Sequence, residues 1–284
     1  MSATGPRMGG VVRAIIPAAG CGTRLRPLSW AVPKELLPAG EIPMIERAVR
    51  EAAAAGIHEV CVVLRRGKEA VAEHLAACGS LAECRLSYRW QQRPLGMGHA
   101  LYCARDFAAD GPFLLIVPDQ FLLGRVSAGR QLLGCYDFDG PTILSSVVRL
   151  RAKEARFFPG ARGIRVAAND RTAFFRGKAV PVRGLVRTMA SDTNQRDARL
   201  AGLGRAIYPP EVFRYMSPRY RNRATGEVDL WETFQALPAG IAHRAMLLRG
   251  TPVDLGTLDG YRRYLPRLLR TLGRKGRGQP RGHR

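Results

Sequence analysis

Apolar and polar positions follow a regular rhythm along the first 150 residues. Short apolar or alternating segments predict four strands, at 11–18, 59–65, 84–90 and 113–119. Between them, apolar residues at helical spacing predict three helices, at 43–56, 68–78 and 98–108. Strands that alternate with helices predict a three-layer, Rossmann-like α/β fold. We expect a mostly parallel mixed sheet with helices on both faces.

The rhythm is looser in the second half of the chain. The regular segments there predict a strand at 142–150, a strand that runs into a helix at 199–213, a helix at 227–240, a strand at 243–250 and a helix at 257–270. Residues 150–198 are rich in Arg, are broken by Gly, and predict short antiparallel strands. We expect one domain over 11–270, in which 150–198 is a divergent insertion, and a flexible start at 1–10.

The composition is that of a soluble globular protein. Of the 284 residues, 46% are hydrophobic and 24% are charged. No apolar run approaches the roughly 18 residues that span a bilayer, and the first ten residues lack the apolar stretch of a signal peptide. The six cysteines include no CxxC pair, which favours buried thiols over disulfides or a zinc site. We therefore expect a cytoplasmic protein without a membrane span.

The net charge of +22 is the unusual feature of the composition. Much of it lies near the end, because residues 262–284 contain no acidic residue. A basic excess is typical of proteins that bind nucleic acid or an anionic surface. A Gly-, Pro- and Arg-rich segment also fits a solvated, disordered tail, here 271–284. The partner of this basic tail, if it has one, stays open.

The first predicted strand leads into a loop rich in Gly and Pro. Gly20 and Gly22 can bring backbone N–H groups close to a phosphate. The loop is neither a dinucleotide fingerprint, because Thr23 and Arg24 follow the second Gly, nor a Walker loop, because no Gly-Lys-Ser/Thr is present. Arg24 and Lys34 would then hold a triphosphate at the carboxyl end of the strand. The alternative is an ordinary structural loop.

The run GCGTRLRPLSWAVPKELLP at 20–38 is long and specific. It resembles the nucleotidyltransferases that make nucleoside-diphosphate sugars, and most of all the bacterial UTP–glucose-1-phosphate uridylyltransferases. The resemblance covers 11–123 strongly and 200–262 moderately, and it implies a glycosyltransferase-A-like version of the fold. It also implies that the Gly-rich loop wraps the nucleotide and that a following Arg and Lys touch its phosphates. The residues at these positions are Ala19, Gly20, Gly22, Thr23, Arg24 and Lys34.

A second match is WQQRPLGMGHAL at 90–101. In the family that this stretch resembles, a Gln and a Gly-x-Gly-His turn contact the base, which implies this role for Gln91, Gly96 and Gly98. An amide can pair with both a donor and an acceptor on a pyrimidine edge. The alternative is a strand-to-helix turn that needs Gly only at its bend.

Two acidic residues match the metal ligands of the family. Asp119 follows an apolar strand in VPDQF, and Asp254 stands in TPVDLGTLDGY near the end of the domain. The resemblance implies that both hold Mg²⁺, which bridges phosphate oxygens. The alternative for Asp254 is that it caps the helix predicted at 257–270.

The sugar side of the resemblance is only partly present. Glu227 in TGEVDLWETF matches a segment that borders the sugar pocket, although it would also suit the start of a helix. The family's Val-Glu-Lys-Pro segment should fall near 186–191, where this chain reads VRTMAS. Arg187 is the cation available there for the sugar phosphate.

The resemblance predicts an enzyme that joins a nucleoside triphosphate, with UTP favoured, to a sugar 1-phosphate, with glucose 1-phosphate favoured. Mg²⁺ is the expected cofactor, and the products would be the nucleotide sugar and pyrophosphate. It also implies a homo-oligomer. One alternative is a regulatory paralogue that binds a nucleotide without turnover. Another is a basic nucleic-acid-binding protein.

Overall fold

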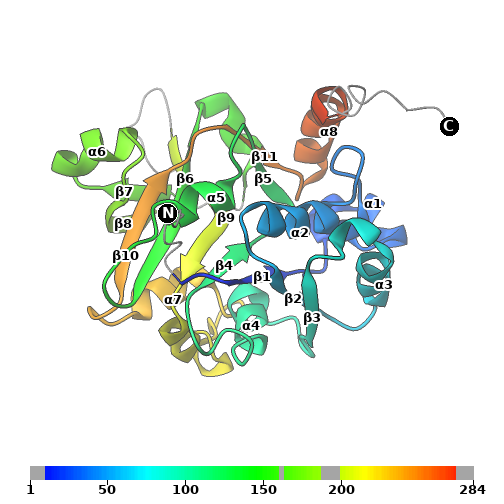
Figure 1. The fold of residues 1–284 in the computed structure, drawn as a ribbon, viewed down its shortest axis with the longest axis horizontal. Helices are drawn as coiled ribbons and strands as arrows, with labels where there is room; N and C mark the ends of the chain where they lie inside the picture. Colours follow the sequence, from blue (N-terminus) through cyan, green and yellow to red (C-terminus); the bar gives the residue numbers. More distant parts are fainter. Residues whose placement is uncertain (1–9, 160–162, 187–198, 273–284) are drawn as a thin grey trace, which may run out of the picture.

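The structure, a computed structural model, describes residues 10–159, 163–186 and 199–272. In these ranges a nine-stranded sheet has the order β3-β2-β1-β4-β9-β6-β10-β8-β7 (Figure 1). Only β9 and β8 run against the direction of the other strands of this sheet. The predicted three-layer, mostly parallel mixed sheet is therefore confirmed.

The amino-terminal half of the sheet is wholly parallel. Its strands are β1 (Arg13–Pro17), β2 (Glu59–Leu64), β3 (Arg85–Trp90) and β4 (Phe113–Ile116). The neighbouring residues Ile15 and Ile16 on β1 are both fully buried but belong to different cores. This strand is thus covered on both faces, which explains why its sequence is a continuous apolar run.

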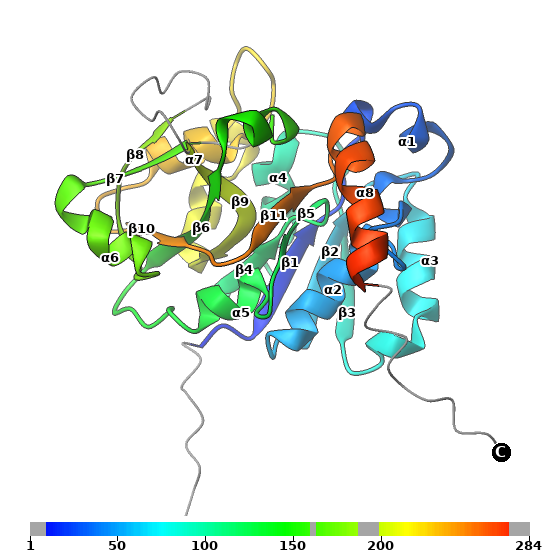
Figure 2. The ribbon, with the colours of Figure 1, turned by 90° about the horizontal axis from the view of Figure 1, so that it is seen from above.

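Helices from different parts of the chain cover the two faces (Figures 1 and 2). One face carries α2 (Met44–Ala54), α3 (Glu69–Ala77), α5 (Ala128–Leu133) and α8 (Leu258–Leu272). The other carries α4 (Gly96–Cys103) and α7 (Leu230–Ala236). A short α1 (Leu28–Ala31) lies in the loop after β1.

The carboxyl-terminal half of the sheet is mixed. It consists of β6 (Thr142–Leu150), β7 (Gly163–Val166), β8 (Val180–Val186), β9 (Arg199–Tyr208) and β10 (Ala242–Leu247). The short antiparallel strands predicted within 150–198 are present as β7 and β8, which pair with each other. The sequence did not predict α6 (Arg171–Phe175) between them.

A separate two-stranded sheet was also missed. Its strands, β5 (Gln120–Leu123) and β11 (Thr251–Asp254), pair antiparallel over residues that are far apart in the chain. Each strand has four residues, too few for a pattern of its own, and each directly follows a longer predicted strand. The pairing is tertiary information, and it places Asp254 opposite Gln120.

Several predicted boundaries need correction. The segment after β9 forms a 3₁₀ helix at Pro210–Tyr215 in place of an α-helix. The helix predicted at 227–240 is shorter and begins at Leu230. Helix α8 continues to Leu272, so the first two residues of the expected tail are helical.

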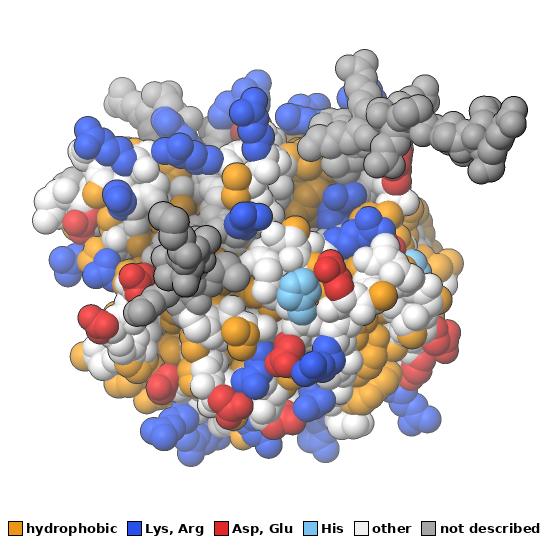
Figure 3. All heavy atoms as spheres, in the orientation of Figure 1, with side chains coloured by type: hydrophobic (Ala, Val, Ile, Leu, Met, Phe, Trp, Pro, Cys, Tyr) orange, Lys and Arg blue, Asp and Glu red, His pale blue; other side chains and the backbone are white. Residues whose placement is uncertain are grey.

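The rest of that tail and nearly all of the expected flexible start lie outside the described residues. Within the described ranges, no helix is long and apolar enough to cross a membrane. Lys and Arg side chains are spread over the face shown in Figure 3, whereas the acidic side chains lie mainly in its lower part.

A buried ion pair ties the two halves of the sheet to helix α2. Arg205 on β9 is 1% exposed, and its guanidinium lies 2.8 Å from the carboxylate of Glu51 on α2. Arg205 also donates to the carbonyl oxygen of Val117, and Glu51 accepts from the backbone of Gly129 on α5. One charge pair thus satisfies polar groups from four segments of the chain.

We predict that Glu51→Ala lowers the free energy of unfolding by about 3–5 kcal/mol, because it leaves the Arg205 guanidinium buried and unpaired. Urea denaturation measures the loss. Glu59→Ala is the matched control, since Glu59 pairs with Arg13 and Arg85 nearer the surface and should cost about 0–1 kcal/mol. Equal losses for the two variants would contradict the structural role of the buried pair.

Candidate active site

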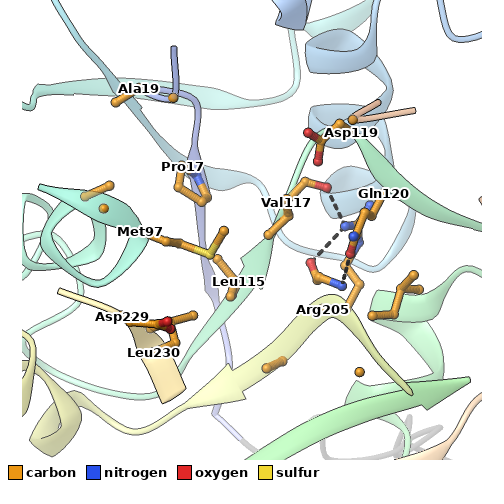
Figure 4. Close-up of a pocket in the computed structure, with 18 of the residues that line it drawn as sticks. Pro17, Ala19, Met97, Leu115, Val117, Asp119, Gln120, Arg205, Asp229 and Leu230 are labelled. Carbon is orange, nitrogen blue, oxygen red and sulfur yellow. Dashed lines mark hydrogen bonds between the residues drawn. The ribbon is translucent and has the colours of Figure 1, made fainter. Parts of the chain in front are cut away.

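A cavity of about 840 Å³ lies beyond the carboxyl ends of β1 and β4. Asp119 and Asp229 approach it from opposite sides, with Met97 and Leu115 between them (Figure 4). Most of the residues predicted from the sequence line this cavity. They are Ala19, Gly20, Thr23, Arg24, Lys34, Gln91, Gly96, Asp119, Glu227 and Asp254.

Two predicted glycines do not line the cavity. Gly22, with φ of 70°, precedes the 3₁₀ turn Thr23–Leu25, and its carbonyl oxygen accepts from the Ser29 hydroxyl. Gly98 donates its N–H to the carbonyl of Val228, and a β-carbon there would lie 2.8 Å from the Val228 side chain. Both glycines shape the walls of the cavity from behind. Arg187 lies outside the described residues.

A buried charge pair that the sequence analysis did not single out fixes the Gly-rich loop. The Lys68 ammonium donates to the carboxylate of Glu35 and to the carbonyl oxygen of Ala18, each at 2.6 Å. Lys68 is 3% exposed and Glu35 is fully buried. Burial lowers the pKa of Lys68, and the attraction of Glu35 opposes this shift. The pair joins the end of β1 to the Pro-Lys-Glu segment, so it sets the position of the loop.

Lys34 and Asp119 form the charged centre of the cavity. The Lys34 ammonium lies 2.5 Å from Oδ2 of Asp119. Burial by itself would raise the pKa of Asp119, but the positive charges of Lys34 and Arg24 hold it below its usual range. The Asp119 carboxylate is therefore ionised at neutral pH.

Asp254 lies next to Asp119 because β5 and β11 pair side by side. Gln120 donates to Oδ2 of Asp254 at 2.7 Å, and its own oxygen accepts from the backbone of Gly204. Burial, together with the negative charge of Asp119, raises the pKa of Asp254 to about 7. A β-carbon on Gly256 would lie 2.7 Å from an Asp119 oxygen and 3.0 Å from an Asp254 oxygen. The two carboxylates thus converge on one point.

This pair of carboxylates suits a divalent cation. Both groups offer hard oxygen ligands, and Mg²⁺ is commonly held by one or two carboxylates together with substrate phosphates. Burial and the negative charge of Asp119 both disfavour a second negative charge, on Asp254. A cation between the carboxylates would compensate this charge. The donor set and its charge therefore fit the metal that the resemblance implied.

Gln91 is held in one orientation at the other end of the cavity. Its Nε2 donates to the Gly96 carbonyl and faces Nδ1 of His99, each at 3.0 Å. Burial lowers the pKa of His99, and its neutral ring accepts this hydrogen bond in the tautomer that carries its proton on Nε2. The Gln91 carbonyl oxygen is then the group that the amide offers to the cavity.

Glu227 lies on a loop that packs against the start of α4. Helix α7 begins three residues later, at Leu230, so Glu227 stands outside that helix. The backbone N–H of Val228 donates to the carbonyl of Leu95, and this bond draws the loop to the cavity wall. The structure therefore places Glu227 at the rim of the cavity.

A buried polar pair on the adjacent strands β6 and β10 was also missed by the sequence analysis. The Ser145 hydroxyl, which lines the cavity, lies 2.9 Å from Nε2 of His243. Burial lowers the pKa of His243 to about 4, so its ring is neutral. No motif marks these residues. Only the pairing of β6 with β10 brings them together.

Comparison with known proteins identifies the family. The profile of the nucleotidyl transferase family matches residues 13–139. A UTP–glucose-1-phosphate uridylyltransferase of Bacillus subtilis is 30% identical over an alignment of 273 residues that covers 88% of this chain and 88% of its own. This chain belongs to the uridylyltransferase family. A Komagataeibacter xylinus protein of the same name is 28% identical and covers 86% of this uridylyltransferase-family chain.

Solved structures show the same fold. A crystal structure of a UDP-glucose pyrophosphorylase complexed with UDP-glucose matches 93% of this chain and 99% of its own, with a TM-score of 0.74 and 22% identity. A UTP-bound UGPase from Acinetobacter baumannii matches with a TM-score of 0.69 and 20% identity. The uridylyltransferase-family chain therefore carries the expected Rossmann-like nucleotidyltransferase fold.

We predict that Lys68→Met lowers the free energy of unfolding by about 3–5 kcal/mol, because it leaves the buried Glu35 carboxylate without its cation. Urea denaturation measures this loss. The double variant Lys68→Met/Glu35→Leu should recover much of it, since no uncompensated charge remains. The single variant Glu35→Leu completes the comparison. If the losses of Lys68→Met and Glu35→Leu simply add in the double variant, the ion pair does not couple the two residues.

Proposed function

We propose that this chain transfers the uridylyl group of UTP to glucose 1-phosphate, giving UDP-glucose and pyrophosphate. The observation that carries the proposal is the convergence of Lys34, Asp119 and Asp254 at the Gly-rich loop, in one cavity with Gln91. The names of the uridylyltransferase relatives support the same substrates.

The residues of the loop would bind the triphosphate. The backbone of Gly20 and Thr23 borders the cavity, and Arg24 and Lys34 bring cations to it. Guanidinium and ammonium groups stabilise charge on phosphate oxygens, most strongly where water is excluded. The Gln91 carbonyl oxygen would accept a hydrogen bond from the N–H of a uracil ring.

Mg²⁺ is the cation that we assign to Asp119 and Asp254, and it would supply neutralisation of phosphate charge. The protein groups do the remaining work. Asp119 and Asp254 would hold the cation, and Gln120 keeps Asp254 in place through its amide. Lys34, which lies against Asp119, carries a positive charge near the phosphates.

The reaction needs positioning more than acid–base chemistry. An oxygen of the sugar phosphate attacks the α-phosphorus of the nucleotide, and a new phosphorus–oxygen bond forms. The bond from the α-phosphorus to the bridging oxygen of the β-phosphate breaks, and pyrophosphate leaves with that electron pair. Alignment of the two substrates and stabilisation of the developing charge carry such a displacement.

The sugar 1-phosphate would occupy the side of the cavity that Glu227 and Ser145 line. The Glu227 carboxylate can accept hydrogen bonds from sugar hydroxyls, and the Ser145 hydroxyl can donate or accept. Arg187 is the residue that we assign to the sugar phosphate on the basis of the sequence alone. It replaces a lysine of the family's pattern with a planar guanidinium, which favours two-pronged contacts to the phosphate.

Pyrophosphate release from a panel of four nucleoside triphosphates and several sugar 1-phosphates tests the function. We expect the highest kcat/KM with UTP and glucose 1-phosphate, and none after chelation of divalent cations. Turnover with another pair would correct the substrates and keep the reaction class. Thermal stabilisation by UTP without turnover of any pair would instead establish the non-catalytic paralogue.

We predict that Lys34→Ala lowers kcat roughly 10²–10³-fold, the usual effect of removing one preorganised group that stabilises transition-state charge. Pyrophosphate release at saturating substrates measures it. Lys178→Ala is the matched control, because Lys178 is an exposed lysine that does not line the cavity. An unchanged kcat in Lys34→Ala would remove Lys34 from the reaction.

A further inference from the structure

A second group of reactive side chains lies outside the cavity, between helices α2 and α3. Figures 1 and 2 show these helices side by side on one face of the sheet. Glu46 comes from the first turn of α2, His74 from α3, and Cys78 directly follows α3. Within the described ranges, these three residues form a group of potential metal ligands, and none of them lines the cavity.

The ligand atoms of the three residues face one another. Oε2 of Glu46 lies 3.1 Å from Nε2 of His74 and 3.3 Å from Sγ of Cys78, and Nε2 and Sγ are 3.4 Å apart. In a tetrahedral zinc site, Zn–O and Zn–N bonds of about 2.0 Å and a Zn–S bond of about 2.3 Å place neighbouring ligand atoms about 3.3–3.6 Å apart. The triangle therefore has nearly the size of one face of that tetrahedron.

The surroundings of the cluster support a bound cation. Glu46 is 5% exposed, and Arg50 bonds its other oxygen, Oε1, which leaves Oε2 directed at the cluster. The side chain of His74 is 31% exposed, which leaves a path from solvent to the cluster.

We propose that Glu46, His74 and Cys78 form a binding site for Zn²⁺ or a similar borderline divalent cation. Sulfur, imidazole and carboxylate ligands together select such ions over Mg²⁺, which prefers oxygen alone. Cys78 binds as the thiolate, and its proton passes to solvent. The protein supplies three ligands, and water completes the tetrahedron.

The proposal revises the interpretation of the cysteines. Their spacing favoured buried thiols over a zinc site, and Cys61 is indeed buried. Cys21, however, is exposed, and Cys78 is only partly buried, next to Glu46 and His74.

Glu35 lies in the segment before α2, and Lys68 directly precedes α3. The proposed site therefore joins the same two parts of the chain as the Lys68–Glu35 ion pair. A cation there would fasten α2 to α3 without entering the cavity.

Titration of the full, metal-free and reduced chain with Co²⁺ tests the site. We expect one equivalent to give d–d bands and a thiolate-to-cobalt charge-transfer band, and Zn²⁺ to abolish both. Cys78→Ser should lose the charge-transfer band. His74→Ala should weaken Zn²⁺ binding by more than the roughly 10–100-fold that loss of an outer-shell partner costs.

Two control variants separate this site from other groups. Cys84→Ser removes another partly buried cysteine, and Asp254→Asn alters the carboxylate pair of the cavity. Both should keep the charge-transfer band. A band that survives Cys78→Ser, or that disappears in Asp254→Asn, would overturn the assignment.

A measurement on the unaltered chain guards against variants that fail to fold. Zn²⁺ should slow alkylation of Cys78 by iodoacetamide while Cys84 in the same molecule reacts at its former rate, as followed by mass spectrometry of peptides. No charge-transfer band, together with equal alkylation with and without Zn²⁺, would show that the three residues form only a hydrogen-bonded cluster.

Discussion

The cavity of this protein depends on the burial of two carboxylates next to each other. Asp119 and Asp254 both lie almost out of solvent, and their oxygens converge beside Gly256. Lys34 compensates the charge of Asp119, while burial and the negative charge of Asp119 raise the pKa of Asp254 to about 7. Such an arrangement is costly unless a positive group completes it. The pair is therefore the place where we propose that a cation and its attached phosphates bind.

The contacts around the cavity hold these two carboxylates next to each other. The pairing of β5 with β11 brings the two acids together, and Gln120 links Asp254 to β9 through its amide. On the other side, Lys68 and Glu35 fix the loop that carries Arg24 and Lys34. These buried ion pairs and hydrogen bonds favour one geometry, because a shift would leave a buried charge unpaired.

The two candidate cation sites differ in their ligand atoms, and each set of ligands suits the surroundings of its site. The cavity offers oxygen ligands and opens to a substrate, so it suits a hard ion that shares its coordination with phosphate. The cluster between α2 and α3 adds sulfur and nitrogen, and it holds two helices that pack on the sheet. One site would serve the reaction and the other the scaffold.

The sequence by itself determined the parallel half of the sheet, the Gly-rich loop and ten of the residues that line the cavity. It could do so because β1 and its loop are local, with a continuous apolar run and then a specific order of Gly, Arg and Lys. Only the tertiary structure decided that Gly98 packs on Val228, that Lys68 supports the loop and that Ser145 meets His243. Those contacts join segments far apart in the chain, and no local pattern encodes a long-range pairing.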